Sequence, residues 1–228
     1  PEQFRRFDHP ARPRQPGGHP AHCRPDHFHS AFHERFQIGL RGRVGEHPAI
    51  HRGREQEGTA RGEVRDEFGK ILTSENPARG LRLLDETGLL LSVLPEIVKL
   101  KGVEQPSEFH PEGDVFIHTM LLMEGLQNAP LELAMACLLH DVGKPATFVM
   151  ATDRIRFHGH DRLGAEMARD ICKRLTFPND QIDLIVALVS EHLRFKDVDK
   201  MRLATLKRFL ALPRFDLHLA LHRLDCLA

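Results

Sequence analysis

The sequence contains no unbroken apolar run of about 18 residues, the length that a membrane-spanning helix needs. Its polar N-terminus, rich in Pro and Arg, shows no signal-peptide pattern. The cysteines form no C-x-x-C pair, and Cys137, Cys172 and Cys226 stand in apolar helical contexts, so we expect reduced core thiols. A formal net charge of zero indicates no partner by itself. These absences favour a cytoplasmic protein without a membrane partner.

Residues 1–62 lack Lys and Met and contain a single Leu. They hold eleven Arg, seven Pro, eight Gly and eight of the sixteen histidines. With so few large aliphatic side chains, this stretch cannot bury enough surface to offset chain entropy, so we expect an irregular or disordered arm. Two alternatives stay open: sequence that is not native coding, such as a GC-rich gene read in the wrong frame, or a metal-binding tract. The tract would comprise His19, His22, His27, His29 and His33.

From Glu63 onward Leu is abundant and apolar residues recur at helical spacing, with caps and breakers between the segments. The stretch 147–158 alternates around a turn at 151–153 and predicts one hairpin. Its two Pro and one Gly make 103–114 a loop. The expected fold is therefore all-α with one small β-hairpin. We expect helices at 63–72, 78–88, 94–102, 115–126, 131–141, 160–175, 179–194, 200–211 and 215–226.

Four histidines fall on apolar helical stripes, which turns their imidazoles toward the core. These are His118, His140, His160 and His192, and Asp141 follows where an apolar helix breaks. A single His on an apolar face is more often a satisfied core residue than a ligand. Four of them beside a carboxylate need partners that these stripes do not supply. A divalent cation would satisfy the whole set; mixed imidazole and carboxylate ligands suit Mn, Fe, Ni, Co or Zn, and with more water Mg.

The order His118, His140-Asp141 and then the distant Asp225 resembles the H…HD…D signature of the HD superfamily of metal-dependent phosphohydrolases. The resemblance implies that these four side chains hold a primary divalent metal, with Mg, Mn, Ni, Co or Fe as candidates. It implies hydrolysis of a phosphomonoester or cyclic phosphodiester, in which a metal-activated water attacks phosphorus.

Two further histidines, His160 and His192, match the extra histidines of HD members that hold a second metal. The resemblance implies that they bind a second metal or the substrate phosphate. Lys144 follows Asp141 closely and could meet that phosphate as a point charge, so Asp141 and Lys144 are the expected catalytic residues.

The neighbouring stretches resemble the C-terminal half of the bacterial tRNA nucleotidyltransferase/poly(A) polymerase family. This resemblance implies a helical RNA-binding segment at 63–105 and an HD domain at 106–228. It also implies tRNA or other RNA and a phosphorylated nucleotide as partners, a role in tRNA 3′-end processing, and no DNA. The stretches are 64-VRDEFGKILTSENPARGLRLLDETGLL-90, 109-FHPEGDVFIHT-119, 157-FHGHDRLGAEMA-168 and 222-HRLDCLA-228.

The sequence also departs from that family. Members carry a nucleotidyltransferase head with a Gly-Gly segment and a D-x-D carboxylate pair. Residues 1–62 contain no D-x-D, so we expect this chain not to add nucleotides by itself. The sequence stops at Ala228, soon after Asp225, which favours a fragment or frameshifted product.

Local charge gives only modest support for RNA binding. Residues 63–104 hold six basic and eight acidic residues, which is no footprint for a phosphate backbone. Residues 194–214 hold seven basic residues against two acidic ones, and we expect RNA contacts from Lys200, Arg202 and Lys207. An ordinary solvated helix face is the alternative. The rival for the whole chain is an RNA-binding module whose HD site is structural or inactive.

Overall fold

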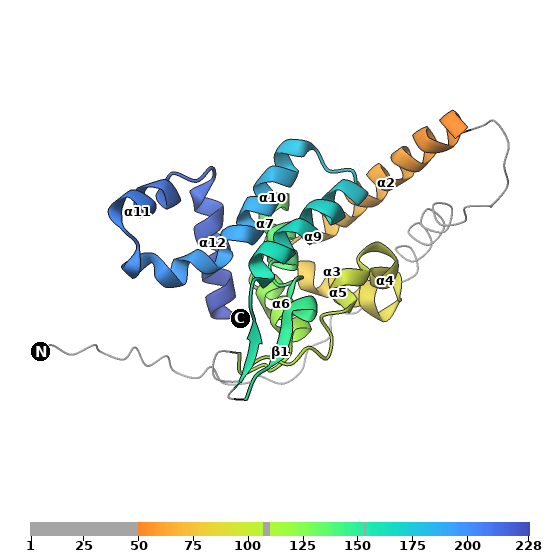
Figure 1. Cartoon of the computed structure of the whole chain (residues 1–228). Coiled ribbons are helices and arrows are strands. Elements are labelled where there is room, and N and C mark those ends of the chain that lie inside the picture. Colours follow the sequence, from red (N-terminus) through yellow and green to blue (C-terminus); the bar gives the residue numbers. More distant parts are fainter. Residues whose placement is uncertain (1–49, 107–109, 153) are drawn as a thin grey trace, which may run out of the picture. The chain divides into compact units, whose positions relative to one another are not determined.

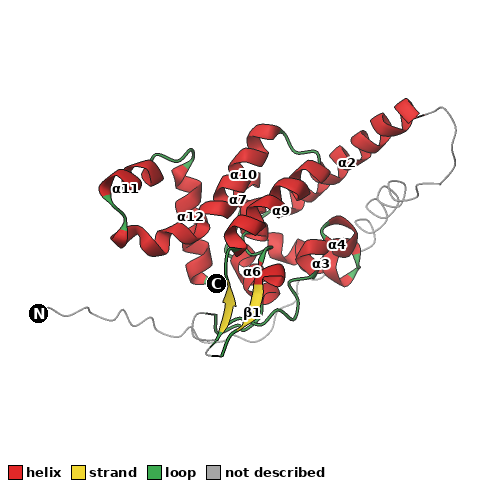
Figure 2. Cartoon of the chain, in the orientation of Figure 1, coloured by secondary structure: helices red, strands yellow, loops and turns green. Residues whose placement is uncertain are grey.

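The computed structural model describes residues 50–106, 110–152 and 154–228, all of which belong to one compact unit. Figure 1 traces the order of the elements, and Figure 2 shows that nearly all of them are helices. The all-α fold with one hairpin is thereby confirmed. Up to residue 49, the predicted arm lies outside the described residues, and with it the histidine tract.

The first described helix, α2 (Ile50–Leu72), begins well before the predicted start at Glu63. Residues 50–62 are therefore helical where an irregular stretch was expected. Their three glycines and low apolar content argued against a helix, but 54-REQE-57 consists of good helix formers. Extending a helix that has already nucleated adds one hydrogen bond for each residue fixed, so polar residues can continue it.

Three short helices follow α2: α3 (Pro77–Glu86), α4 (Leu89–Val93) and α5 (Pro95–Val98). The side chain of Asn76 caps α3 by accepting a hydrogen bond from the amide of Arg79. Arg174 of α9 (His160–Arg174) joins α5 to the later helices, since its guanidinium donates to both carboxylate oxygens of Glu96 at 2.7 and 2.9 Å.

The core is built around α7 (Leu131–Leu139), whose residues from Leu133 to Leu139 are all buried. It packs against α2, α6 (Val115–Glu124), α10 (Asn179–Glu191) and α12 (Phe215–Leu227), and α10 packs in turn against α9. A helix that is apolar all round must lie inside the fold. The end of α7, where His140 and Asp141 follow, is therefore also buried.

Shorter elements connect these helices. A four-residue helix, α8 (Lys144–Thr147), leads into β1 (Phe148–Met150), which pairs antiparallel with β2 (Ile155–Phe157), as the predicted hairpin requires. The predicted helix 179–194 instead ends at Glu191 and continues as a 3₁₀ helix, η1 (His192–Lys200). Helix α11 (Leu203–Leu210) follows.

The described cysteines differ from the prediction at one position. Cys137 and Cys172 are buried free thiols, and burial raises the pKa of Cys172 to about 12. Cys226 is exposed, so the prediction of a core thiol is wrong there. Helical spacing fixes only the direction of a side chain, and no described element covers that face of α12. None of the described helices is both long and apolar enough to cross a membrane.

Candidate metal centre

The six side chains that the sequence singles out as ligands converge in the fold. Three of them lie on α6, α9 and α12, and the other three follow the ends of α7 and α10. They form two adjoining groups. In each group the potential ligand atoms lie within 4.8 Å of one another. The groups are His118, His140 and Asp225, and Asp141, His160 and His192.

In the first group, Asp225 Oδ1 lies 3.0 Å from His118 Nε2 and 3.6 Å from His140 Nε2. The second group is organised around Asp141, whose Oδ1 lies 3.4 Å from His160 Nε2. Its other oxygen, Oδ2, lies 3.2 Å from His140 Nε2. Asp141 therefore stands between the groups, with one oxygen facing each.

Backbone carbonyls orient three of the four imidazoles. The Nδ1 atoms of His140, His160 and His192 lie 2.9, 2.7 and 2.7 Å from the carbonyl oxygen three residues earlier in each case. His140 and His192 follow the ends of α7 and α10, where helix carbonyls have no intrahelical partner. An Nδ1–H donated in this way leaves the Nε2 lone pair free to face the centre.

Most of the ligand side chains are buried and some of their polar atoms lack hydrogen-bond partners within the described residues, as expected for residues that bind a cation. All the members except Asp225 are buried, and the side chain of Asp225 is 22% exposed, so it marks the accessible side of the centre. The Nε2 atoms of His140 and His160 have no hydrogen-bond partner within the described residues. Buried polar atoms without partners cost free energy, and a divalent cation with imidazole and carboxylate ligands would satisfy them.

Electrostatics keep the carboxylates ionised. Burial opposes ionisation, but the charges of protonated His140 and of Lys144 hold the pKa of Asp141 well below its usual range. Asp141 and Asp225 in turn raise the pKa of His140 against the effect of burial, so a metal would have to displace its Nε2 proton. Burial likewise opposes ionisation of Asp225, whose hydrogen bond with His118 lowers its pKa to about 2. Burial and the neighbouring His140 lower the pKa of His192 to about 4, so this imidazole is neutral at pH 7. Deprotonated carboxylates and a neutral imidazole are the forms that bind metal.

Lys144, which the sequence predicts to meet a substrate phosphate, lies beside Asp141. It is buried, its Nζ lies 2.6 Å from Asp141 Oδ2, and it donates to Gln105 Oε1 at 2.5 Å. The reason is local, because Lys144 opens α8 one turn after Asp141 and its side chain folds back. Its nearest charged partner is thus Asp141.

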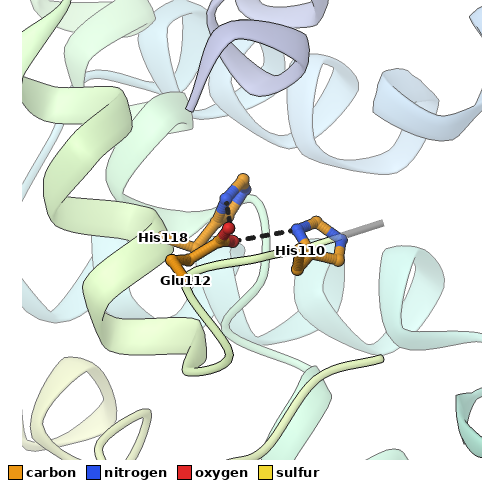
Figure 3. A group of neighbouring side chains, drawn as sticks. All are labelled: His110, Glu112 and His118. Atoms are coloured by element: carbon orange, nitrogen blue, oxygen red, sulfur yellow. Dashed lines mark hydrogen bonds and ion pairs between the residues drawn. The ribbon is translucent and has the colours of Figure 1, made fainter. Parts of the chain in front are cut away.

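Sequence reasoning missed the loop before α6. Glu112 Oε1 lies 2.9 Å from His118 Nδ1 and 3.1 Å from His110 Nδ1, as Figure 3 shows. The side chain of Glu112 is only 6% exposed. Loops have no periodicity that reveals a buried face, and the one available signal was the stretch HPEGD just before His118.

The predicted RNA-binding residues follow His192 in the chain: Lys200 ends η1, Arg202 precedes α11 and Lys207 lies on α11. Lys200, Arg202 and Lys207 are all exposed. Lys200 has only a loose pairing with Asp197, at 3.9 Å. Their role stays a prediction, as do the ligand roles of the six converging side chains.

Two family models match parts of the chain. Residues 114–214 match the HD domain, and residues 64–100 match the probable RNA and SrmB-binding site of polymerase A. The resemblance inferred from the sequence is thereby confirmed. The matched ranges fall within the predicted segments 63–105 and 106–228, whose exact boundaries stay predictions.

Similar proteins include a tRNA nucleotidyltransferase and multifunctional CCA proteins. An A-adding tRNA nucleotidyltransferase of Deinococcus radiodurans is 42% identical over 136 residues, which are 57% of this chain and 31% of the relative. A multifunctional CCA protein of Ralstonia nicotianae is 36% identical over 132 residues, covering 57% and 30%. Another from Methylobacillus flagellatus is 36% identical over 149 residues, covering 64% and 36%. The chain thus spans about a third of the length of these relatives.

Proposed function

We propose that this chain carries the phosphohydrolase centre of a tRNA nucleotidyltransferase/poly(A) polymerase-like protein involved in tRNA 3′-end processing. The reaction is hydrolysis of a phosphomonoester or a cyclic phosphodiester. One observation carries the proposal: Asp141 stands between two adjoining groups of buried ligands, with one oxygen facing each. Sites with two adjacent cations recur in enzymes that cleave phosphate esters.

The ligand sets follow from the two groups. His118, His140 and Asp225 would hold one divalent cation, with Asp141 Oδ2 completing the set. His160 and His192 would hold a second cation or the substrate phosphate, together with Asp141 Oδ1. Bound cations supply Lewis-acid assistance to the attack of water on phosphorus. Mg, Mn, Ni, Co and Fe all suit such donors.

The groups around the ligands orient the imidazole rings and balance the charge of the centre. The backbone carbonyls behind His140, His160 and His192 fix the tautomer that presents Nε2 to the centre. Lys144 holds Asp141 in its ionised form and places a positive charge beside the position where negative charge develops on the phosphate. The partly exposed Asp225 side lets substrate enter.

The rival function is an RNA-binding module whose HD site is structural. The match of residues 64–100 to an RNA-binding family favours it, and so does the exposed basic face at Lys200, Arg202 and Lys207. The two functions are compatible in one chain. We do not assign nucleotide addition to this chain, because residues 1–62 contain no D-x-D pair.

Hydrolysis separates the two functions. The full chain is stripped with a chelator, loaded with Mn or Ni, and assayed on a 2′-nucleotide and a 2′,3′-cyclic nucleotide. We expect metal-dependent release of phosphate or ring opening, and its loss in Asp141→Ala. The matched control is His158→Ala, an exposed histidine two residues before His160. No hydrolysis by the loaded wild-type chain, with tRNA binding intact, would favour the binding module.

A further inference from the structure

His118 differs from the other three imidazoles of the centre in how its ring can be oriented. His140, His160 and His192 each use a backbone carbonyl three residues earlier. The corresponding carbonyl for His118 belongs to Val115 and already accepts the hydroxyl of Thr119 at 2.8 Å. His118 lies inside α6 rather than at its end, so it has no unused helix carbonyl within reach.

A carboxylate stands where that carbonyl would be needed. Glu112 Oε1 lies 2.9 Å from His118 Nδ1 (Figure 3). Asp225 contacts the other ring nitrogen, Nε2, at 3.0 Å. The two atoms are within hydrogen-bonding distance, but the N–H of the ring does not point along the line to the oxygen. The other oxygen of Glu112 is buried and has no hydrogen-bond partner within the described residues.

We infer that Glu112 is a positioning residue of the centre. It accepts a hydrogen bond from the Nδ1–H group of His118, so that the Nε2 atom faces the cation. Carboxylates behind metal-binding histidines fix the ring and make the ligand nitrogen more basic. The inference rests on the proposed metal centre but not on its hydrolytic activity.

The competing interpretation is an additional cation, separate from those of the centre, held by His110, Glu112 and His118. Their ligand atoms also lie within 4.8 Å of one another. A neutral imidazole has one acceptor nitrogen and one N–H donor. His118 would have to bind metal through both nitrogens to serve this cluster and the centre at once. Hydrogen bonding to Glu112 needs no such deprotonation and is therefore favoured.

The same loop also reaches the other side of the centre. Gln105 Nε2 approaches Glu112 Oε1 at 3.4 Å, and Gln105 Oε1 accepts from Lys144 at 2.5 Å. Lys144 in turn pairs with Asp141 at 2.6 Å. A chain of polar contacts therefore runs from His118 to Asp141 through residues of the loop before α6. Glu112 is the branch point of this chain of contacts, because its Oε1 also lies 3.1 Å from His110 Nδ1.

The test compares Glu112→Ala and Glu112→Gln with Glu104→Gln, an exposed acid in the same loop. Titration of the stripped full chain with Ni should show affinity lowered by about 10–100-fold in Glu112→Ala, the usual cost of losing such a partner. Glu112→Gln retains an acceptor oxygen and should lose less. The number of bound ions should not change, and Glu104→Gln should match the wild type.

Side-chain ¹⁵N spectra of His118 give a readout that a merely structural role would not move. Without metal, Asp225 also faces Nε2, so the wild type should show a proton on Nδ1 next to Glu112, whereas Glu112→Ala should shift His118 to the tautomer protonated only at Nε2. Unchanged affinity and an unchanged tautomer in folded Glu112→Ala would overturn the inference. It would equally be overturned if one bound ion disappeared while the affinity for the rest stayed the same, or if the wild type bound no metal.

Discussion

Asp225 Oδ1 lies 3.0 Å from His118 Nε2, although 107 positions of the chain separate the two residues. The contact joins α12 to α6 and places a carboxylate between His118 and His140. Helix α12 thus supplies the carboxylate that faces the Nε2 atom of His118. Binding of metal should therefore depend on α12.

The substitution Asp225→Asn tests this dependence, because it keeps the size of the side chain and removes the charge. We expect the affinity for a divalent cation to fall at least about tenfold, equivalent to about 1.4 kcal/mol, as measured by calorimetric titration. The control is Asp216→Asn on the same helix, where an exposed acid pairs with Arg214. Equal affinities in both variants would remove Asp225 from the ligand set.

A second prediction concerns the contact between Gly143 and the start of α9. A Cβ atom at Gly143 would lie 2.3 Å from the carbonyl oxygen of His160 and 2.8 Å from the amide nitrogen of Gly164. Gly143→Ala must therefore shift α9, and with it His160. We expect a loss of about 1–3 kcal/mol in the free energy of unfolding, measured with urea, and weaker metal binding.

Gly164→Ala is the matched control for that substitution. A Cβ there would meet its nearest neighbours at 3.5–3.6 Å, which is ordinary contact. Gly143 is therefore the more tightly packed of these two glycines. A Gly143→Ala variant as stable as Gly164→Ala would contradict the packing described for this joint.

The pH dependence of stability should report the ion pair of Glu96 and Arg174. Burial opposes ionisation of Glu96, but the hydrogen bond and charge of Arg174 lower its pKa below 4.5. A folded pKa below the unfolded value stabilises the protein above about pH 4.5, and the contribution is lost as the pH falls through the folded pKa. The difference in urea midpoint between wild type and Arg174→Gln should therefore be constant near neutrality and shrink below that pH. A difference that persisted undiminished in acid would contradict the role of this pair.

The basic face around η1 and α11 should contact RNA backbone if the chain binds RNA there. Reversal of Lys200, Arg202 and Lys207 to Glu should weaken tRNA binding. The slope of the logarithm of the binding constant against the logarithm of the salt concentration should decrease in magnitude by about one for each lost phosphate contact. Filter binding over a range of salt concentrations measures both. Reversal of the exposed Arg162 and Lys173 on α9 serves as the control. Unchanged tRNA binding with an unchanged salt dependence would show that these basic residues form an ordinary solvated surface.

The sequence predicted most of the fold because helical periodicity and breakers are local signals. Asn76 capped α3 and the hairpin paired at Phe148 and Phe157, both as the local pattern required. Local signals failed at helix ends. Polar residues could extend α2 to Ile50, and the helix of His192 changed to 3₁₀ geometry, because both outcomes depend on small balances of free energy.

The centre was predictable only in part for the same reason. His118, His140, His160 and His192 lie on apolar stripes, and a stripe reveals that a side chain points inward. Glu112 lies in a loop, where no period distinguishes a buried carboxylate from a solvated one. The pairing of Lys144 with Asp141 likewise follows from how α8 folds back, which spacing alone does not specify.

Metal binding by the stripped chain tests the central claim most directly. Equilibrium dialysis with Mn, followed by elemental analysis, should show saturable binding by the wild type and its loss in His140→Ala, with His158→Ala as the control. The same cation should raise the melting temperature of the wild type, because a ligand that binds only the folded state stabilises it. Absence of bound metal in the wild type, or equal binding by His140→Ala, would contradict the account.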